Sequence, residues 1–288
     1  MKYGIREICD VVLKAKASVK IGNKTFAKGE PVIYFDSLKT STMEGAATTV
    51  YAQGGRGNTR LVAWEGERTV TFTMEDALIS ELGLAVLTGA GIIEAGVEGA
   101  KVKVHTTAKF AATETEFPVE ETLVADADIY AIELDEYDNI LSTEKAAAGT
   151  KAITYTVKNK DKAKAVMFDF YVEKATGAKQ IEITADKFAG NYYLEASTLF
   201  RSADGVDHPA EFIIPNCKIQ SNFTFTMASS GDPSTFTFTM DAFPDYTKFD
   251  YTKKVLSVIQ IIDEMAPIVD KTADADDTDE AVAGWLNF

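Results

Sequence analysis

Few side chains in this sequence have the types and spacing that catalysis requires. His208 stands beside Asp207 in the segment Asp204-Gly-Val-Asp-His-Pro209. A His next to a carboxylate can act as a general acid or base. No nucleophile accompanies this group, however, and charges within a Gly/Pro segment are typical of turns. We therefore predict a tight turn here, and we interpret His105, which has no partner in spacing, as a packed or solvated residue.

Acidic side chains gather in a second group that could bind a cation. Hard carboxylate oxygens suit Ca²⁺, but the spacing does not match an EF-hand loop, so a solvated acidic face is the interpretation we favour. The group consists of Asp126, Asp128, Glu133, Asp135, Glu136 and Asp138.

Cysteine and glycine motifs add no cofactor or metal site. Cys9 and Cys217 lie far apart in the sequence and are predicted to be buried free thiols. Gly89-Ala-Gly91 lacks the third Gly of a dinucleotide-binding loop and follows a predicted helix, so we expect a helix C-cap and a turn. We predict no catalytic residue, no metal and no cofactor.

Composition excludes some classes of function. The 288-residue chain has a formal net charge of -15, which argues against a nucleic-acid binder held by phosphate contacts. No run is long and apolar enough to cross a bilayer, and the N-terminal residues lack a signal-peptide core. We expect synthesis in the cytoplasm.

The elements that would position any site are mainly strands. Phe223-Thr-Phe-Thr-Met227 and Phe236-Thr-Phe-Thr-Met240 flank a Gly/Pro turn, and Val70-Thr-Phe-Thr-Met-Glu-Asp-Ala77 is a third copy. Their alternation predicts an antiparallel hairpin with an aromatic face, within one sheet of related strands. Other strands are predicted at 17–21, 31–35, 61–64, 69–74, 102–110, 127–134, 152–157, 165–172, 180–184, 191–200 and 255–262, the last of them buried.

We expect a β-barrel or sandwich with one flanking α-helix over 76–87, capped by Asp76, with Leu78, Leu82 and Val86 on its buried face. Residues 1–118 and 188–265 are predicted to form a discontinuous core, and 119–187 an inserted small β-sandwich. Residues 266–288 are predicted to form an acidic C-terminal arm.

Two segments are candidate subunit contacts. Residues 40–60 are small and polar and predict a long loop, which is either an arm that packs on a neighbouring subunit or a mobile surface loop. The acidic arm ends in large apolar side chains that could dock on another subunit. The candidate interface residues are Gly54, Gly55, Arg56, Gly57, Trp285, Leu286 and Phe288.

The segment from Leu199 to Asn222, which runs into FTFTMASSGDPSTFTFTMDAFPD, resembles the major tail tube proteins of contractile-tailed (myovirus-type) bacteriophages. The upstream TFTMEDALISELGLAVL is similar to the same family. The likeness is clear over the last third before the acidic arm and looser elsewhere, and the 119–187 module is larger than a minimal tail tube domain.

The resemblance implies a structural virion protein without enzymatic activity. Its rings would be hexameric and would stack into a hollow tube that conducts DNA without binding it specifically. It further implies contacts with the tail sheath, tape measure, baseplate and neck proteins, and no membrane. The alternative is a calcium-binding bacterial surface or adhesin-type β-sandwich protein.

Overall fold

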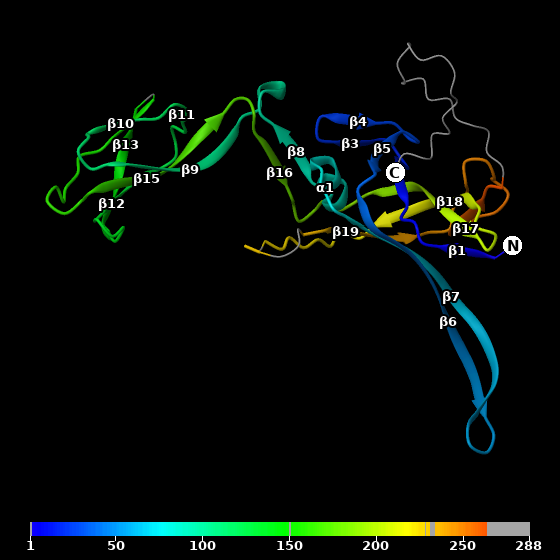
Figure 1. Cartoon of the computed structure of the whole chain (residues 1–288). Helices are drawn as coiled ribbons and strands as arrows, with labels where there is room; N and C mark the ends of the chain where they lie inside the picture. The colour runs from blue at the N-terminus through cyan, green and yellow to red at the C-terminus, as the bar shows by residue number, and fades with distance from the viewer. Residues whose placement is uncertain (1, 150, 228, 231–233, 264–288) are drawn as a thin grey trace, which may run out of the picture. The chain divides into compact units, whose positions relative to one another are not determined.

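The computed structural model describes residues 2–149, 151–227, 229–230 and 234–263 (Figure 1). The protein is mainly β, with 56% of its residues in strands and 4% in helices, which confirms the expected fold class. The chain divides into two compact units. Unit 1 contains residues 1–20, 24–89 and 186–288, and unit 2 contains residues 21–23 and 90–185.

Unit 1 is built on an antiparallel sheet of nine strands. The strand order is β5-β2-β17-β18-β19-β7-β6, with β1 beside β17 and β20 beside β18. The strands are β1 (Tyr3–Ile5), β2 (Asp10–Ala15), β5 (Pro31–Phe35), β6 (Leu38–Gly54), β7 (Thr59–Asp76), β17 (Asn191–Ser202), β18 (Asp207–Ile219), β19 (Phe236–Ala242) and β20 (Val258–Ile261). A short ribbon of β3 (Val19–Ile21) and β4 (Lys24–Phe26) precedes β5.

Two of the three Phe/Thr copies lie side by side in this sheet, as the sequence predicts. Phe238 of β19 pairs with Met74 of β7, and Met240 pairs with Phe72. All four side chains are buried because alternate residues of a strand face the same side. Phe35 packs its ring against Phe238 at a centroid distance of 4.9 Å.

The expected hairpin between residues 223–227 and 236–240 forms only at its base. Cys217–Ile219 of β18 pair with Met240–Ala242 of β19, and Gln220 N donates to Thr239 O. β7 pairs with the opposite edge of β19, and residues 221–227 belong to no described strand. The prediction of a complete hairpin was therefore wrong, because the ladder between β18 and β19 ends at Ile219 and Met240.

The single α-helix of the described residues, α1 (Glu81–Thr88), is shorter than predicted. Ser80 caps its start, with Oγ accepting from Gly83 N at 2.8 Å, and Gly89 ends it in the left-handed conformation. Asp76 is not the cap. It accepts hydrogen bonds from the Ser37 hydroxyl and from Leu78 N, and Leu78 itself is 70% exposed rather than buried.

Unit 2 contains a seven-stranded antiparallel sheet. Its order is β10-β14-β13-β12-β15-β11, with β9 beside β15. The elements are β8 (Gly91–Glu94), the 3-10 turn η1 (Val97–Gly99), β9 (Val102–Ala111), β10 (Glu116–Pro118), β11 (Thr122–Leu123), β12 (Ile129–Leu134), β13 (Ile140–Ala148), β14 (Ala152–Thr154), β15 (Ala165–Lys174) and β16 (Lys179–Glu182). β16 pairs with β8 in a separate ribbon. Phe117 and Phe168 meet at 4.7 Å in the core.

β9 pairs with β15 along its whole length, from Val102–Lys174 to Ala111–Ala165, and both strands belong to unit 2, residues 21–23 and 90–185. The predicted division into domains, with residues 1–118 and 188–265 as the core and 119–187 as an insertion, stays a prediction. β20 is half-exposed rather than buried, because it covers β18 only from Ala210 to Ile213.

Candidate assembly surfaces

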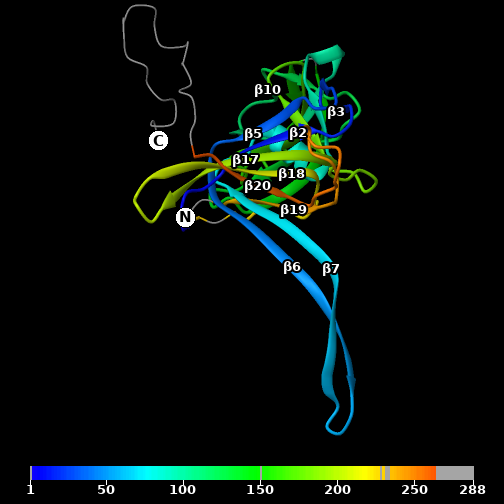
Figure 2. The ribbon, with the colours of Figure 1, turned by 90° about the vertical axis from the view of Figure 1, so that its right-hand side faces the viewer.

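The most distinctive surface of unit 1 is a long two-stranded arm formed by residues 44–69 of β6 and β7. Figures 1 and 2 show this ribbon extending beyond the rest of the sheet. The two strands pair from Leu38–Asp76 to Gly54–Thr59. The prediction of a loop over 40–60 was wrong. Neither face of the arm is buried, so its small and polar residues show no alternation of period two.

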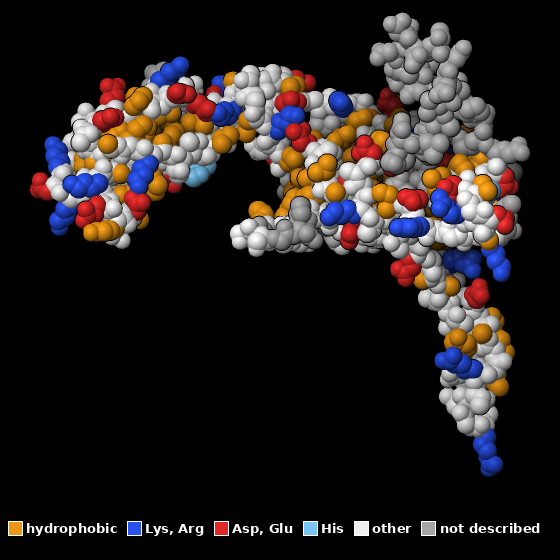
Figure 3. Space-filling model, viewed as in Figure 1, with side chains coloured by type: hydrophobic (Ala, Val, Ile, Leu, Met, Phe, Trp, Pro, Cys, Tyr) orange, Lys and Arg blue, Asp and Glu red, His pale blue; other side chains and the backbone are white. Residues whose placement is uncertain are grey.

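Large apolar side chains lie on both faces of the arm. Val50 pairs with Trp64, which is 55% exposed, and Ala52 pairs with Val62, so these residues share one face. Tyr51 pairs with Ala63 on the other face, and Figure 3 shows hydrophobic side chains along the arm. An isolated two-stranded ribbon is marginal in water, and clustered exposed apolar groups mark interaction surfaces. The arm therefore has the properties of a segment that another surface covers.

The tip of the arm is a tight turn that contains the predicted contact residues. Gly54 ends β6, and Gly55, Arg56 and Gly57 form the turn, with positive φ at Gly55 and Gly57. Asn58 N donates to Gly55 O at 3.1 Å. Arg56 is exposed.

The remaining predicted contact residues, Trp285, Leu286 and Phe288, lie outside the described residues. Sequence reasoning missed Val50, Val62 and Trp64 as surface residues. The run Leu61-Val-Ala-Trp64 could have indicated them, because its consecutive positions are apolar. In a strand, such a run places apolar side chains on both faces, and one face alone cannot bury them all.

A second open surface is the first Phe/Thr copy. Phe223, Phe225 and Met227 are all exposed, and Met227 is 90% exposed. The ring centroids of Phe225 and Phe236 lie 5.4 Å apart, and the Ser234 hydroxyl donates a hydrogen bond to Thr226 O. Because residues 221–227 are in no described ladder, this segment offers a β-prone chain with backbone groups open to a further partner.

A polar face of unit 1 lies opposite the buried Phe and Met side chains of β7 and β19. Three rows cross β6, β7 and β19 there, and we call them the Thr–carboxylate face. The rows are Thr40–Glu75–Thr237, Thr42–Thr73–Thr239 and Glu44–Thr71–Asp241. None of these nine positions carries a Lys or an Arg, but the exposed Lys218 of the next strand, β18, pairs with Asp241 and continues the third row.

The two His residues form no catalytic arrangement. His208 is buried on β18, with Nδ1 3.4 Å from the Asp263 carboxylate. Arg201 donates two hydrogen bonds to Asp207, and Ser202 N donates to Val206 O, so the predicted tight turn is confirmed. His105 is exposed on β9, with Nε2 3.0 Å from Asp169 Oδ1.

Residues of the chain itself contact much of the acidic group of unit 2. Lys145 binds Asp128 at 2.8 Å, Lys109 binds Asp138, and Asp135 accepts from Asn139 and from Tyr137 N. Among the residues that the structure describes, no group of three or more His, Cys, Asp or Glu could hold a metal ion. Cys9 and Cys217 are buried free thiols, as predicted.

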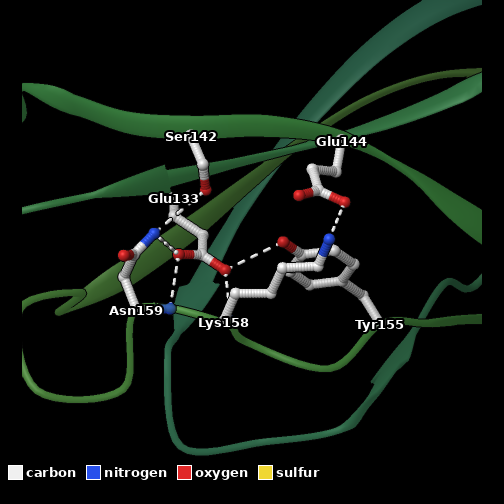
Figure 4. A network of polar contacts seen from close by, with 6 residues as sticks. All are labelled: Glu133, Ser142, Glu144, Tyr155, Lys158 and Asn159. Atoms are coloured by element: carbon white, nitrogen blue, oxygen red, sulfur yellow. Dashed lines mark hydrogen bonds and ion pairs between the residues drawn. The ribbon is translucent and has the colours of Figure 1, made fainter.

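Glu133 is a buried member of that acidic group and has a structural role (Figure 4). Its carboxylate accepts from the Tyr155 hydroxyl at 2.8 Å and from Lys158 N at 2.6 Å. It also accepts from Asn159 N at 3.0 Å and from Asn159 Nδ2 at 2.8 Å. These four donors fasten the segment after β14 to β12 and leave the carboxylate no free face for a ligand.

Within the described part of the chain, no helix has the length and apolar character needed to span a membrane. A search of curated proteins found no match to the chain. A family model described as the YomU/Tube protein family matches residues 6–256. The match includes the arm, every strand of the unit 1 sheet except β1 and β20, and all of unit 2. The family name indicates a tube-type structural protein, and the chain belongs to the YomU/Tube protein family.

Proposed function

We propose that this protein is the building block of a bacteriophage tail tube of the contractile, myovirus type. Protomers form hexameric rings, and the rings stack into a hollow tube through which the phage DNA enters the host. The observation that carries this proposal is the exposed arm of residues 44–69, with apolar side chains on both faces.

The arm serves as the tie between protomers. Burial of Trp64, Val50 and Val62 against a neighbour removes apolar surface from water, at roughly 25 cal/mol per Å². Heterologous contacts of this kind close into rings when the rotation allows and otherwise propagate as stacks. Arg56 at the tip adds a cation that can meet an acidic group on the neighbour.

The sheet of unit 1 continues from one protomer to the next. β5 and β6 end its strand order, so their outer edges are open in a single protomer. Residues 221–227 provide a further unpaired segment with high β propensity. Pairing between protomers satisfies these backbone groups and removes edges that otherwise promote aggregation.

The Thr–carboxylate face lines the lumen. A wall of hydroxyls and carboxylates repels DNA phosphates weakly and offers few cations to hold them. This arrangement fits the net charge of -15. DNA therefore passes through the tube without specific binding.

The tail sheath, the tape measure protein, and the baseplate and neck proteins are the further partners. The protein resides in the virion tail after synthesis in the host cytoplasm, with no membrane association and no enzymatic activity. No observation on the described residues favours the calcium-binding adhesin, because the acidic side chains of unit 2 show no metal-binding cluster.

Electron microscopy of the purified full chain tests this function. We expect rings or tubes with sixfold symmetry. Deletion of residues 53–58 is expected to leave a folded protomer that cannot polymerise. Dispersed monomers of the intact chain under all assembly conditions would overturn the tube, whereas normal tubes from the deletion variant would overturn only the role of the arm tip.

A further inference from the structure

We propose that a loop between β19 and β20 is the receptor for the acidic C-terminal segment of a second copy of this chain. The loop comprises residues 243–254, and we call it the aromatic–lysine loop. The segment it receives is residues 270–280 together with the apolar residues that follow. This inference rests on the proposed tube, because it specifies one contact between stacked protomers.

The aromatic–lysine loop holds aromatic side chains out into solvent. Phe243, Tyr246, Phe249 and Tyr251 are exposed, and Phe249 is 92% exposed. The loop is tied at its base, since Asp245 and Val255 exchange backbone hydrogen bonds of 3.1 and 2.9 Å. A tied loop that exposes this much aromatic surface has the composition of an interface centre.

Lysines surround these aromatic rings in a protein that is otherwise acidic. Lys16, Lys28 and Lys248 line a hollow of about 290 Å³ together with Tyr246 and Tyr251. Lys16 contacts Asp245 at 2.7 Å, and Lys248 contacts Glu195 at 3.3 Å.

Other lysines of this surface form no close ion pair within the described residues. Lys254 lies over the Tyr246 ring at 5.5 Å. Among the described residues, no carboxylate lies within ion-pair distance of Lys28, Lys253 or Lys254, although Asp250 and Asp245 of the same loop interact electrostatically with Lys253 and Lys254. The surface therefore has cations available for an acidic partner.

The C-terminal sequence has the complementary composition. Residues 264–288 lie outside the described residues, but residues 270–280 read DKTADADDTDE, with six carboxylates against one Lys. Trp285, Leu286 and Phe288 follow after residues 281–284. An acidic run next to large apolar groups matches lysines next to exposed aromatic rings, and such complementarity determines which partner binds.

The loop and the last described residues lie at opposite ends of β18. Phe243 N donates to Asn216 O at one end of β18, whereas Asp263 contacts His208 at the other end. Eight residues of strand separate these points, which is about 27 Å at the rise of a β-strand. When protomers stack head to tail along β18, the C-terminal segment of one protomer starts beside the loop of the next.

Carbodiimide coupling of assembled tubes tests the contact, because it joins Lys to Asp or Glu only when they touch. Tubes are assembled from equal amounts of ¹⁴N- and ¹⁵N-labelled full chain, and the linked peptides are identified by mass spectrometry. We expect isotopically mixed links between Lys253 or Lys254 and residues 270–280. The double variant Lys253→Glu and Lys254→Glu should lower the yield of links from Lys28 and Lys248 to that segment about tenfold.

A charge swap provides the decisive control. Asp276→Lys and Asp277→Lys, added to the loop variant, should restore contact between the loop and the segment, whereas Lys160→Glu and Lys162→Glu on unit 2 should leave the links unchanged. Links within single chains only, or no links to residues 270–280, would overturn this inference. Binding of the loop to anionic vesicles, in the absence of links to residues 270–280, would overturn it as well. Tubes seen by microscopy in that case would leave the proposed function standing.

Discussion

At the scale of single residues, Glu133 shows how hydrogen bonds can stabilise a buried charge. Burial alone raises the pKa of a carboxyl group, because water no longer solvates the anion. Here the donors from Lys158, Tyr155 and Asn159 outweigh burial and lower the pKa of Glu133 to about 2. The same contact, together with burial, raises the pKa of the Tyr155 hydroxyl.

This pKa shift predicts a pH-dependent stability. The folded pKa lies below the ordinary value of 4.5, so the stabilisation is complete above pH 4.5 and is lost as the pH falls toward 2. Glu133→Gln should lower the free energy of unfolding at pH 7 by about 2 to 3 kcal/mol. It should also flatten the pH dependence in that window. Urea unfolding followed by near-ultraviolet circular dichroism measures both.

Asp128→Asn is the matched control, because Asp128 precedes β12 but is exposed and paired only at the surface. It should change stability little. Equal effects of the two substitutions would contradict a special role for the buried carboxylate.

Gly89 is a second residue whose identity the fold requires. It ends α1 with φ of 70°, and a Cβ at this position would lie against the backbone of Phe188. Gly89→Ala should therefore destabilise unit 1 by about 2 to 4 kcal/mol. Gly29→Ala has a similarly positive φ but open space around its Cβ, so it should cost about 1 kcal/mol. Urea midpoints of the two variants separate steric conflict from backbone strain, and equal midpoints would argue against the conflict.

At the scale of elements, the sequence predicts strands well where one face is buried. β2, β15 and β19 alternate buried and exposed residues, and this alternation is visible in their sequences. β6 escaped prediction because its outer half has no buried face to impose a pattern. The prediction of a strand at the first Phe/Thr copy, residues 223–227, was wrong although its sequence pattern is clear. Its pattern is strongly β, but its pairing with β19 ends at Gln220 and its Phe side chains stay exposed.

The arm gives the element-scale prediction. Val50→Ser with Trp64→Ser should leave the free energy of unfolding of the protomer within about 0.5 kcal/mol of its original value, since both side chains are exposed. Loss of an aromatic interface anchor typically costs about 2 kcal/mol or more, so the critical concentration for polymerisation should rise at least about 30-fold. Sedimentation of assembled tubes measures this concentration.

The control for the arm replaces exposed apolar residues of unit 2. Tyr137→Ser with Ile140→Ser removes side chains of comparable exposure and should leave the critical concentration near its original value. An arm variant that polymerises like this control would show that the arm is not an assembly contact.

At the scale of the whole molecule, the candidate surfaces were only partly readable from the sequence. Arg56 and its glycines were expected at a contact, and the structure places them at the tip of an exposed arm. The Thr–carboxylate face could not be predicted from the sequence, because it depends on which strands are neighbours in the sheet. Thr42, Thr73 and Thr239 meet only through the pairing of β6, β7 and β19, which no local pattern encodes.

The Thr–carboxylate face leads to the prediction for the assembled tube. Tubes of the unaltered protein should bind duplex DNA no more tightly than about 10⁻⁴ M even at low salt, because the proposed lumen has few cations that could release phosphate counterions. Thr73→Lys with Thr239→Lys should convert the same wall into one that retains DNA, with an affinity that falls steeply as salt rises. Fluorescence anisotropy of a labelled duplex, read across a salt series, measures both.

Thr107→Lys on the exposed side of β9 adds charge outside this face and should produce no comparable retention. A map of the assembled tube with a predominantly basic lining would contradict the like-charge conduit, though not the tube.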